Sequence, residues 1–307
     1  MHASILKYFA AVARLGSIRK ASEELHIATS ALSRQIKKLE DELGITLFER
    51  LPEGLRLTGA GRIVLRHARS TLQNYEVMRG ELGDLEGKIT GRIPIACLDS
   101  LVISFLPQYL MEFIRRHPAV DFRVRTENYT NIFRLVADDE VDIGITFDIA
   151  RPGDIKLLSS VRMPIMAIVA RGHPLARMSS VTLEQCAQFK LLLQLDNNVT
   201  SRMFSLELGT LERNARALIA TNNQMLLKPL IISGEGVAFY TPLGFHEELL
   251  KGDVVAVPIA GVRTEEARLG VVVPRVRKLP HASEVMAAFL ADRLAAFAAK
   301  IDEIVAR

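Results

Sequence analysis

The chain has 307 residues, of which 49% are hydrophobic and 24% are charged. This composition is ordinary for a globular protein, gives no indication of extended disorder, and leaves room for two or three domains. The net charge is only +4, but residues 1–69 hold 12 Lys and Arg against 7 Asp and Glu, whereas residues 89–307 hold 25 against 24. The asymmetry favours an N-terminal nucleic-acid-binding domain joined to a neutral domain, with a solvated basic face as the alternative.

Several classes of protein are disfavoured by motifs that the sequence lacks. It has no apolar run of about 18 residues and no charged start followed by a long apolar stretch, so we expect a cytoplasmic protein without membrane contact. It has no phosphate-binding loop, no dinucleotide fingerprint and no zinc or hydrolase motif, so we expect no enzyme, no metal and no cofactor. Cys97 and Cys186 lie in apolar contexts without CxxC spacing, which predicts buried, reduced thiols, with a redox switch as the alternative.

Residues 17–48 have the pattern of a helix-turn-helix, preceded by a helix over roughly residues 4–15. Ser17 is a suitable N-cap for the first helix of the motif, and the short break at residues 26–28 predicts a tight corner. In the following helix the apolar positions step by 4, 3 and 4, and Gly44 ends it. We expect this stripe to be buried: Leu32, Ile36, Leu39 and Leu43.

The opposite face of that helix carries side chains that suit phosphates and base edges and have no place in a core. They are Thr29, Ser30, Ser33, Arg34, Gln35, Lys37 and Lys38. We therefore expect this helix to bind DNA. Thr29 stands at its start, where it serves as a cap or as a DNA contact.

Residues 47–58 predict two short strands around a turn, because Pro52 and Gly54 interrupt a short apolar alternation. Such a hairpin after a helix-turn-helix is a wing. Arg50 and Arg56 flank the turn, and basic side chains at a wing commonly contact the DNA backbone or the minor groove. Two solvated arginines are the alternative.

A long helix follows, capped by Thr58 and reaching to about residue 88, since apolar residues recur every three or four positions. A helix of this length spans about 46 Å and cannot fold back on a compact domain, so we expect its apolar stripe to pair with a second copy of the chain. The stripe consists of Val64, Ala68, Leu72, Tyr75, Met78, Leu82, Leu85 and Ile89.

From about residue 90 the pattern changes to alternating strands and helices, which predicts a mostly parallel, doubly wound sheet. A first lobe is expected at about residues 90–161 and 265–307, and a second lobe at about residues 162–264. The two crossovers between the lobes leave a ligand cleft between them. The predicted fold class is therefore α/β overall.

The N-terminal motifs resemble those of the bacterial LysR-type transcriptional regulators. They are Ala31-Leu32-Ser33-Arg34-Gln35-Ile36, Leu39-Glu40, Leu43-Gly44, Leu47-Phe48-Glu49-Arg50 and Leu57-Thr58, with further similarity at residues 141–145 and 172–176. The resemblance implies a winged helix-turn-helix at residues 1–58, a dimerisation linker helix at 59–89 and a two-lobed, periplasmic-binding-protein-like effector domain at 90–307. The chain departs from the family at residues 28–30, where members usually have Ser-Gln-Pro or Ser-Gln-Ser, and this departure concerns the operator sequence and not the fold.

Polar residues precede helices on both sides of the expected cleft, where free amides and the partial positive charge of a helix start suit a carboxylate or a phosphate. The effector-binding candidates are Ser100, Thr130, Thr200, Ser201 and Asn222. The alternative is that each only caps its own helix. Leu98 stands where many family members are polar, and with Phe147 and Tyr240 it favours a less polar pocket for an aromatic or medium-sized carboxylate.

These observations predict a sequence-specific DNA-binding transcription regulator that binds a small effector and changes DNA bending. The expected partners are operator DNA, the effector, further copies of the chain in a homodimer or homotetramer, and RNA polymerase. The alternative is a solute-binding receptor or an enzyme on a bilobal fold with an accessory DNA-binding module. A receptor would need an export signal and an enzyme would need converging acids and bases, and neither is visible in the sequence.

Overall fold

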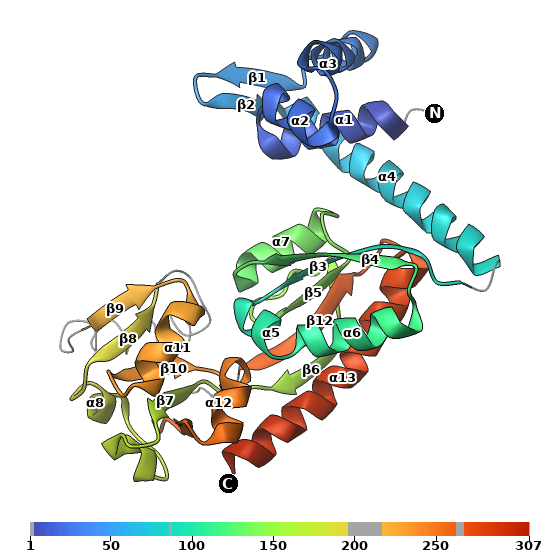
Figure 1. The fold of residues 1–307 in the computed structure, drawn as a ribbon. Helices are drawn as coiled ribbons and strands as arrows, with labels where there is room; N and C mark the ends of the chain where they lie inside the picture. The colour runs from blue at the N-terminus through green and yellow to red at the C-terminus, as the bar shows by residue number, and fades with distance from the viewer. Residues whose placement is uncertain (1–2, 86–87, 196–216, 262–266, 307) are drawn as a thin grey trace. The chain divides into compact units, whose positions relative to one another are not determined.

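The computed structural model describes residues 3–85, 88–195, 217–261 and 267–306 (Figure 1). The chain divides into two compact units, of which unit 1 holds residues 1–91 with 138–140 and unit 2 holds the rest. In the described parts of the chain, no helix is both long enough and apolar enough to cross a membrane.

Unit 1 is a three-helix motif followed by a hairpin and a long helix, as the sequence predicts. Its elements are α1 (Ala3–Leu15), α2 (Ile18–Leu25), α3 (Thr29–Leu43), β1 (Phe48–Leu51), β2 (Gly54–Leu57) and α4 (Gly59–Leu85). The Ser17 side chain accepts a hydrogen bond from the amide of Lys20, which confirms it as the N-cap of α2. Gly44 has a φ of 65° and ends α3 in the left-handed conformation, which glycine adopts without strain.

The core of unit 1 joins all four helices and the start of the wing. Phe9 of α1 is fully buried, and its ring centroid lies 5.2 Å from that of Phe48. From α3 this core receives Leu32, Ile36 and Leu39. Leu43 was expected on the same stripe, but it is 49% exposed and the prediction is wrong for this residue, because the core of unit 1 does not extend to the last turn of α3.

The helix α4 is divided along its length between two environments. Thr58 accepts a hydrogen bond from the amide of Gly61, 2.9 Å away, and so caps the helix as predicted. In the first turns Leu65 and Ala68 belong to the core of unit 1. Further along, large apolar side chains are exposed at a spacing of 3, 4 and 3 residues: Tyr75, Met78, Leu82 and Leu85.

The first lobe of unit 2 is a five-stranded sheet in the order β4-β3-β5-β12-β6. Its elements are β3 (Gly91–Cys97), α5 (Asp99–Ile103), α6 (Leu106–Arg116), β4 (Val120–Thr126), α7 (Tyr129–Ala137), β5 (Ile143–Phe147), β6 (Ile155–Arg162), β12 (Arg268–Pro274) and α13 (His281–Val305). Strands β3 and β5 are parallel, while β12 runs antiparallel to both of its neighbours. The helix α13 runs alongside β6 and β12 (Figure 1).

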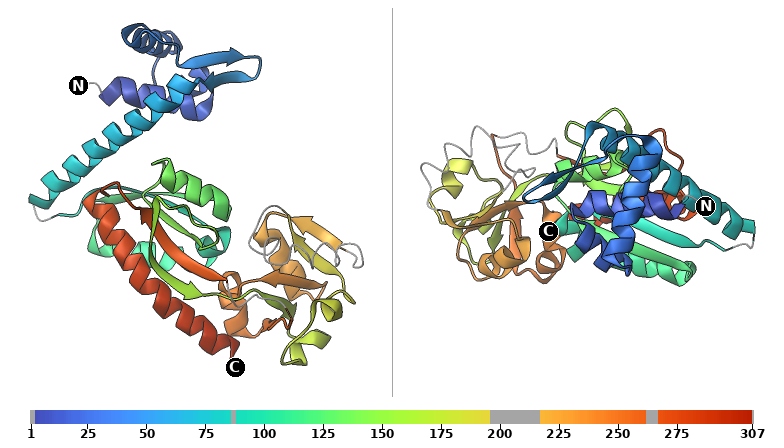
Figure 2. Two further views of the ribbon diagram at one scale, coloured as in Figure 1. Left: turned by 180° about the vertical axis from the view of Figure 1, so that it is seen from behind. Right: turned by 90° about the horizontal axis from the view of Figure 1, so that it is seen from above.

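The second lobe has a sheet in the order β11-β7-β10-β8-β9, in which β8 is parallel to β9 and β10. Its elements are β7 (Met166–Ala170), η1 (Pro174–Arg177), α8 (Leu183–Cys186), β8 (Leu191–Gln194), β9 (Ala217–Thr221), α11 (Gln224–Ile232), β10 (Val237–Tyr240), η2 (Pro242–Phe245), α12 (His246–Lys251) and β11 (Val254–Val257). The chain crosses between the sheets after β6 and again after β11, as expected, and both views of Figure 2 separate the two sheets.

Two features tie unit 2 together. Asp142 is 1% exposed, forms an ion pair with Arg277 at 3.0 Å and accepts a hydrogen bond from the hydroxyl of Ser283. Between the lobes, the hydroxyl of Ser104 donates to the carbonyl oxygen of Leu243 over 2.8 Å. After β3 the chain forms two successive helices, α5 and α6, and after β10 it forms the pair η2 and α12.

Both cysteines are buried and free, as expected. Burial raises the pKa of the Cys97 thiol to about 12, and the charge of Asp99 adds to this effect. Burial likewise raises the pKa of the Cys186 thiol to about 12. Both thiols therefore stay protonated and unreactive at neutral pH.

Candidate functional site

The exposed face of α3 carries the polar side chains that were expected to contact DNA. Ser30, Arg34, Lys37 and Lys38 are exposed, and Ser33 is half-buried. Lys38 has an acidic neighbour, Glu42, at 3.7 Å, but both groups are mostly exposed and such a pair is weak in water. Polar and basic groups thus line the side of α3 that faces away from its core.

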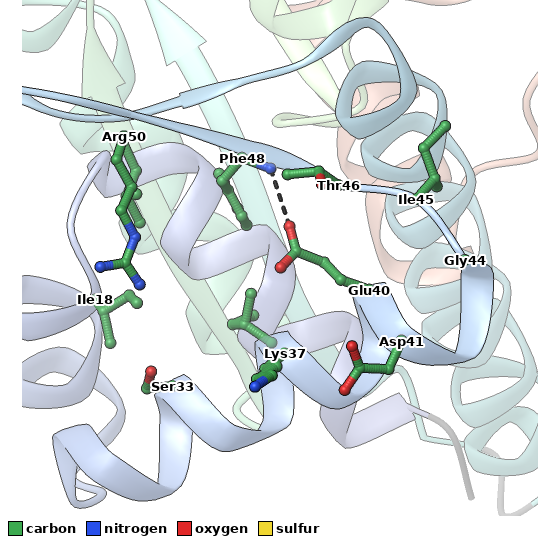
Figure 3. A pocket seen from close by; sticks show the side chains of 12 residues that line it. Ile18, Ser33, Lys37, Glu40, Asp41, Gly44, Ile45, Thr46, Phe48 and Arg50 are labelled. Atoms are coloured by element: carbon green, nitrogen blue, oxygen red, sulfur yellow. Dashed lines mark hydrogen bonds between the residues drawn. The ribbon is translucent and has the colours of Figure 1, made fainter.

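A groove lies between α3 and the wing, and we call it the wing groove (Figure 3). Its larger part is a hollow of about 600 Å³, into which Lys37 and Ser33 extend from α3 and Arg50 from β1. A smaller hollow of about 380 Å³ adjoins it, reaches Ser17 and Thr29, and shares Ser33 and Arg50 with it. The groove therefore connects the start of α3 to the wing.

The two sides of the wing groove are held together by Glu40. Its carboxylate accepts a hydrogen bond from the backbone amide of Leu47 at 2.6 Å. It also accepts one from the amide of Phe48 at 3.2 Å, which Figure 3 shows. On the other side of the wing, the amide of Leu55 donates to the carbonyl oxygen of Gly16 over 2.8 Å. The wing is thereby fixed against α2 and α3, and the groove exists before any ligand binds.

The two wing arginines differ in their surroundings. Arg56 is bonded to Glu49, the residue opposite it in the hairpin, with Nη2 to Oε2 at 2.8 Å and Nε to Oε2 at 3.2 Å. Arg50 has no ion pair with any acid among the described residues, and it lines both hollows. Arg50 is therefore free to bind an anion in the groove, whereas Arg56 is already held by Glu49 in an exposed pair.

Thr29 does not cap α3. The N-cap position belongs to Ala28, which makes no capping bond through its side chain. The Thr29 hydroxyl instead lies 2.8 Å from the hydroxyl of Ser22, which is 3% exposed. The prediction that Thr29 caps α3 is thus wrong. The capping residue precedes the first helical residue, and Thr29 is itself the first residue of the helix.

The effector-binding candidates fall into three groups. Ser100, Leu98, Phe147 and Tyr240 are buried. Thr130 and Asn222 are exposed. Thr200 and Ser201 lie outside the described residues.

The exposed candidates do not cap their helices either. Asn128 caps α7, because its side-chain oxygen accepts from the amide of Asn131 at 2.9 Å and from the hydroxyl of Thr130 at 2.8 Å. Asn223 caps α11 by accepting from the amide of Met225 at 2.9 Å. In both cases the adjacent asparagine serves as the cap, so the capping alternative is wrong for Thr130 and for Asn222.

A cluster of polar groups lies where α5, α11 and β10 meet, and we call it the lobe junction. It includes the predicted Ser100 and Tyr240, and also Asp99 and Gln224, which sequence reasoning missed. The carboxylate of Asp99 accepts a hydrogen bond from the amide of Ser100 at 2.8 Å, and the backbone of Gln224, in the other lobe, acts to lower its pKa. Burial raises the pKa of Asp99. Burial also raises the pKa of Tyr240, and the negative charge of Asp99 raises it further. These groups come from different lobes, so no spacing in the sequence brings them together.

Two of these buried polar groups have no hydrogen-bond partner in the described part of the chain. The side-chain amide of Gln224, a residue that is 1% exposed, is unpaired at both its oxygen and its nitrogen, and so is the hydroxyl of Tyr240. A Cβ at Gly244 would lie 2.1 Å from the Gln224 amide nitrogen, so the glycine of η2 is what leaves room for this side chain. Unpaired buried groups carry a cost and often mark functional positions.

Comparison with known proteins decides the family. Residues 4–62 match the model described as bacterial regulatory helix-turn-helix protein, lysR family, and residues 86–295 match the LysR substrate binding domain. The chain belongs to the LysR family. It is a DNA-binding transcription regulator with an effector-binding domain and is not an enzyme, which decides against the receptor or enzyme alternative.

Relatives of this LysR-family regulator extend over most of its length. The RuBisCO operon transcriptional regulator of Allochromatium vinosum is 30% identical over 267 residues, which are 85% of this chain and 87% of that protein. The regulator CfxR of Cupriavidus necator is 29% identical over 301 residues, 95% of this chain and 92% of that one.

Solved structures share the fold at lower identity. A full-length OxyR variant from Pseudomonas aeruginosa has a TM-score of 0.65 at 20% identity and covers 99% of this chain and 94% of that one. The regulator CbnR, complexed with its target DNA, has a TM-score of 0.59 at 19% identity and covers 95% of this chain and 99% of that one. Within the described parts of this chain, no three His, Cys, Asp or Glu residues are grouped so as to hold a metal ion.

Proposed function

We propose that this LysR-family regulator binds its operator with α3 in the major groove and with the DNA backbone in the wing groove. The observation that carries this is the wing groove, which is fixed by Glu40 and is lined by Ser33, Lys37 and Arg50, with the acidic Asp41 beside them. Basic side chains along such a groove gain affinity by displacing counterions from phosphates. Ser30, Arg34 and Lys38 extend the same basic face, and Arg56 lies at its margin.

The difference between Arg50 and Arg56 provides the test. Arg50→Ala removes a charge that lines the groove, so binding to an operator fragment should weaken about uniformly across sequences, and the slope of log K against log salt should fall by about 1. Arg56→Ala is the matched control, because Arg56 donates to Glu49 and lines neither hollow of the groove, so it should change the slope much less. Equal slopes for the parent and Arg50→Ala, measured by fluorescence anisotropy, would refute the proposed path of the backbone.

We infer that the regulator is a homodimer formed through α4, within a linker at residues 59–89. Support comes from the exposed apolar side chains of its outer half, which recur at the spacing of a coiled-coil seam. By resemblance to the family, two such dimers form a homotetramer through their effector domains at residues 90–307, and RNA polymerase is a partner at the promoter. We propose a cytoplasmic location, where the DNA of a bacterium lies.

We infer that a small effector, an aromatic or medium-sized carboxylate, binds at the lobe junction and changes DNA bending. Leu98 and Phe147 are the apolar candidates for its contacts, and Ser100 and Tyr240 would supply hydroxyl groups. Thr130, Thr200, Ser201 and Asn222 remain candidates for its outer contacts. The negative charge of Asp99 lies close to the start of α11, where the backbone of Gln224 acts to lower its pKa, so an effector anion is expected to lie away from this helix end.

A double variant tests this assignment. Ser100→Ala with Tyr240→Phe removes both hydroxyl groups while keeping the apolar surface. It should abolish effector-dependent changes in the operator footprint and leave operator affinity within a few fold. An unchanged response to the natural effector, sought by screening carboxylates, would place the effector elsewhere.

A further inference from the structure

The direction of the hydrogen bond between Thr29 and Ser22 follows from a third atom. The Ser22 hydroxyl lies 2.8 Å from the Thr29 hydroxyl and 2.8 Å from the carbonyl oxygen of Arg19. A carbonyl oxygen only accepts, and a serine hydroxyl has a single proton. The proton of Ser22 is therefore donated to Arg19, and the bond between the two hydroxyl groups is donated by Thr29.

This chain of hydrogen bonds is shielded at one end and open at the other. Ser22 is 3% exposed, so neither water nor DNA reaches it to change the pattern. Thr29 is exposed, is the first residue of α3 and lines the wing groove. With its only proton directed inward, the Thr29 hydroxyl presents lone pairs alone to whatever occupies the groove.

An oxygen that only accepts has few partners on DNA. Phosphate oxygens accept, and so do O6 and N7 of guanine, N7 of adenine and O4 of thymine. In the major groove the donors are the amino groups at N6 of adenine and N4 of cytosine. A free threonine would bond to donors and acceptors alike, so the buried bond is what makes the residue selective.

We propose that Thr29 reads the amino group of an adenine or a cytosine, and that the buried Ser22 is a positioning residue that fixes this polarity. The inference rests on the proposed function, because it requires the start of α3 to lie in the major groove, where the first residues of a reading helix contact base edges. It also rules out a phosphate contact for the Thr29 hydroxyl.

The experiment selects binding sites from a pool of random DNA duplexes with the full-length chain and compares base frequencies at every position. The parent should enrich adenine or cytosine at one position of each half-site, by about three- to tenfold over guanine and thymine, the effect of one hydrogen bond. Thr29→Val keeps the shape, removes the hydroxyl and should lose this preference. Thr29→Ser keeps the hydroxyl and should retain it.

Ser22→Ala is the decisive variant. It leaves Thr29 in place but frees its proton, so guanine and thymine should become tolerated at that one position while all other positions keep their preferences. Ser70→Ala, at an exposed position of α4, is the matched control and should change nothing. Thermal unfolding of each variant verifies that the helix-turn-helix is intact.

Each alternative outcome has a separate meaning. A preference for guanine or thymine at the position that Thr29→Val alters, or an unchanged preference in Ser22→Ala, overturns the inference while the proposed function stands. An unchanged preference in Thr29→Val overturns it as well, because Thr29 then reads no base. A parent chain that enriches no sequence at all overturns the proposed function and the inference together.

Discussion

The wing groove and the lobe junction both collect polar side chains, but they satisfy them in opposite ways. Around the groove, Glu40 and the buried Ser22 use their hydrogen-bonding capacity within unit 1, and other groups, such as Arg50, face the groove. At the junction, the amide of Gln224 and the hydroxyl of Tyr240 are buried and lack a partner in the described part of the chain. The groove is thus complete before it binds, whereas the junction has buried polar groups whose desolvation is not compensated.

The largest expected effect is a loss of stability in unit 2 that leaves the stability of unit 1 unchanged. Asp142→Ala removes the buried carboxylate from its ion pair with Arg277, which should lower the free energy of unfolding of unit 2 by about 3 to 5 kcal/mol. Differential scanning calorimetry should show a lower transition for unit 2 and an unchanged one for unit 1. Asp142→Asn, which keeps the shape and an acceptor for Ser283, should cost less. Equal losses in both units would mean that they unfold as one.

The second prediction concerns the outer half of α4, which is apolar but exposed. Met78→Asp with Leu82→Asp would place charges in the proposed seam and should weaken dimerisation by about 100-fold or more, about 3 kcal/mol. Sedimentation over a range of concentrations measures this. Asn74→Asp, a charge change at an exposed polar position of the same helix, is the control. A double variant that stays dimeric would show that α4 is not the interface.

The third prediction removes the group that fixes the wing. Glu40→Ala leaves the amides of Leu47 and Phe48 without their acceptor, so unit 1 should lose about 1 to 2 kcal/mol of stability, and operator affinity should fall with it. Glu40→Gln keeps one acceptor oxygen and should lose less. Normal affinity in a clearly destabilised Glu40→Ala would show that DNA itself positions the wing.

The smallest effect is expected at the lobe junction and depends on pH. Because burial raises the pKa of Asp99 above its unfolded value, the folded state disfavours the carboxylate, and this penalty is present at neutral pH and is relieved as the pH falls through the folded pKa. Asp99→Asn keeps an acceptor without the charge. It should therefore be slightly more stable than the parent at neutral pH, with a difference that shrinks towards acidic pH in urea unfolding. A difference that grows on acidification would contradict the raised pKa.

The reliability of sequence prediction differed between these regions for a physical reason. In unit 1 the caps and stripes are local, so Ser17, Gly44 and Thr58 were identified from neighbours within four residues. The burial of Leu43 was predicted wrongly, because burial at the end of an apolar stripe depends on how far the rest of the core extends.

The lobe junction depends on contacts that are distant in the chain. Asp99 and Gln224 are 125 positions apart, and nothing near either residue indicates the other. The same holds at shorter range for Thr29, because its partner Ser22 lies in a different helix and the hydrogen bond depends on the angle between the two. The lobes and their strands were predicted because hydrophobic alternation specifies strands, but side-chain partners across elements are not encoded in any periodicity.

The division of α4 between two environments has a mechanical consequence. Leu65 and Ala68 fix the first turns of α4 in the core that also holds α1 and α3. If α4 rotates, α3 therefore rotates with it. At 1.5 Å per residue, its 27 residues form a lever about 40 Å long. A tilt of about 10° at the outer end moves the other end by about 7 Å, roughly two base-pair steps. A small change in how two such levers cross would therefore alter the spacing between the two reading helices of a dimer.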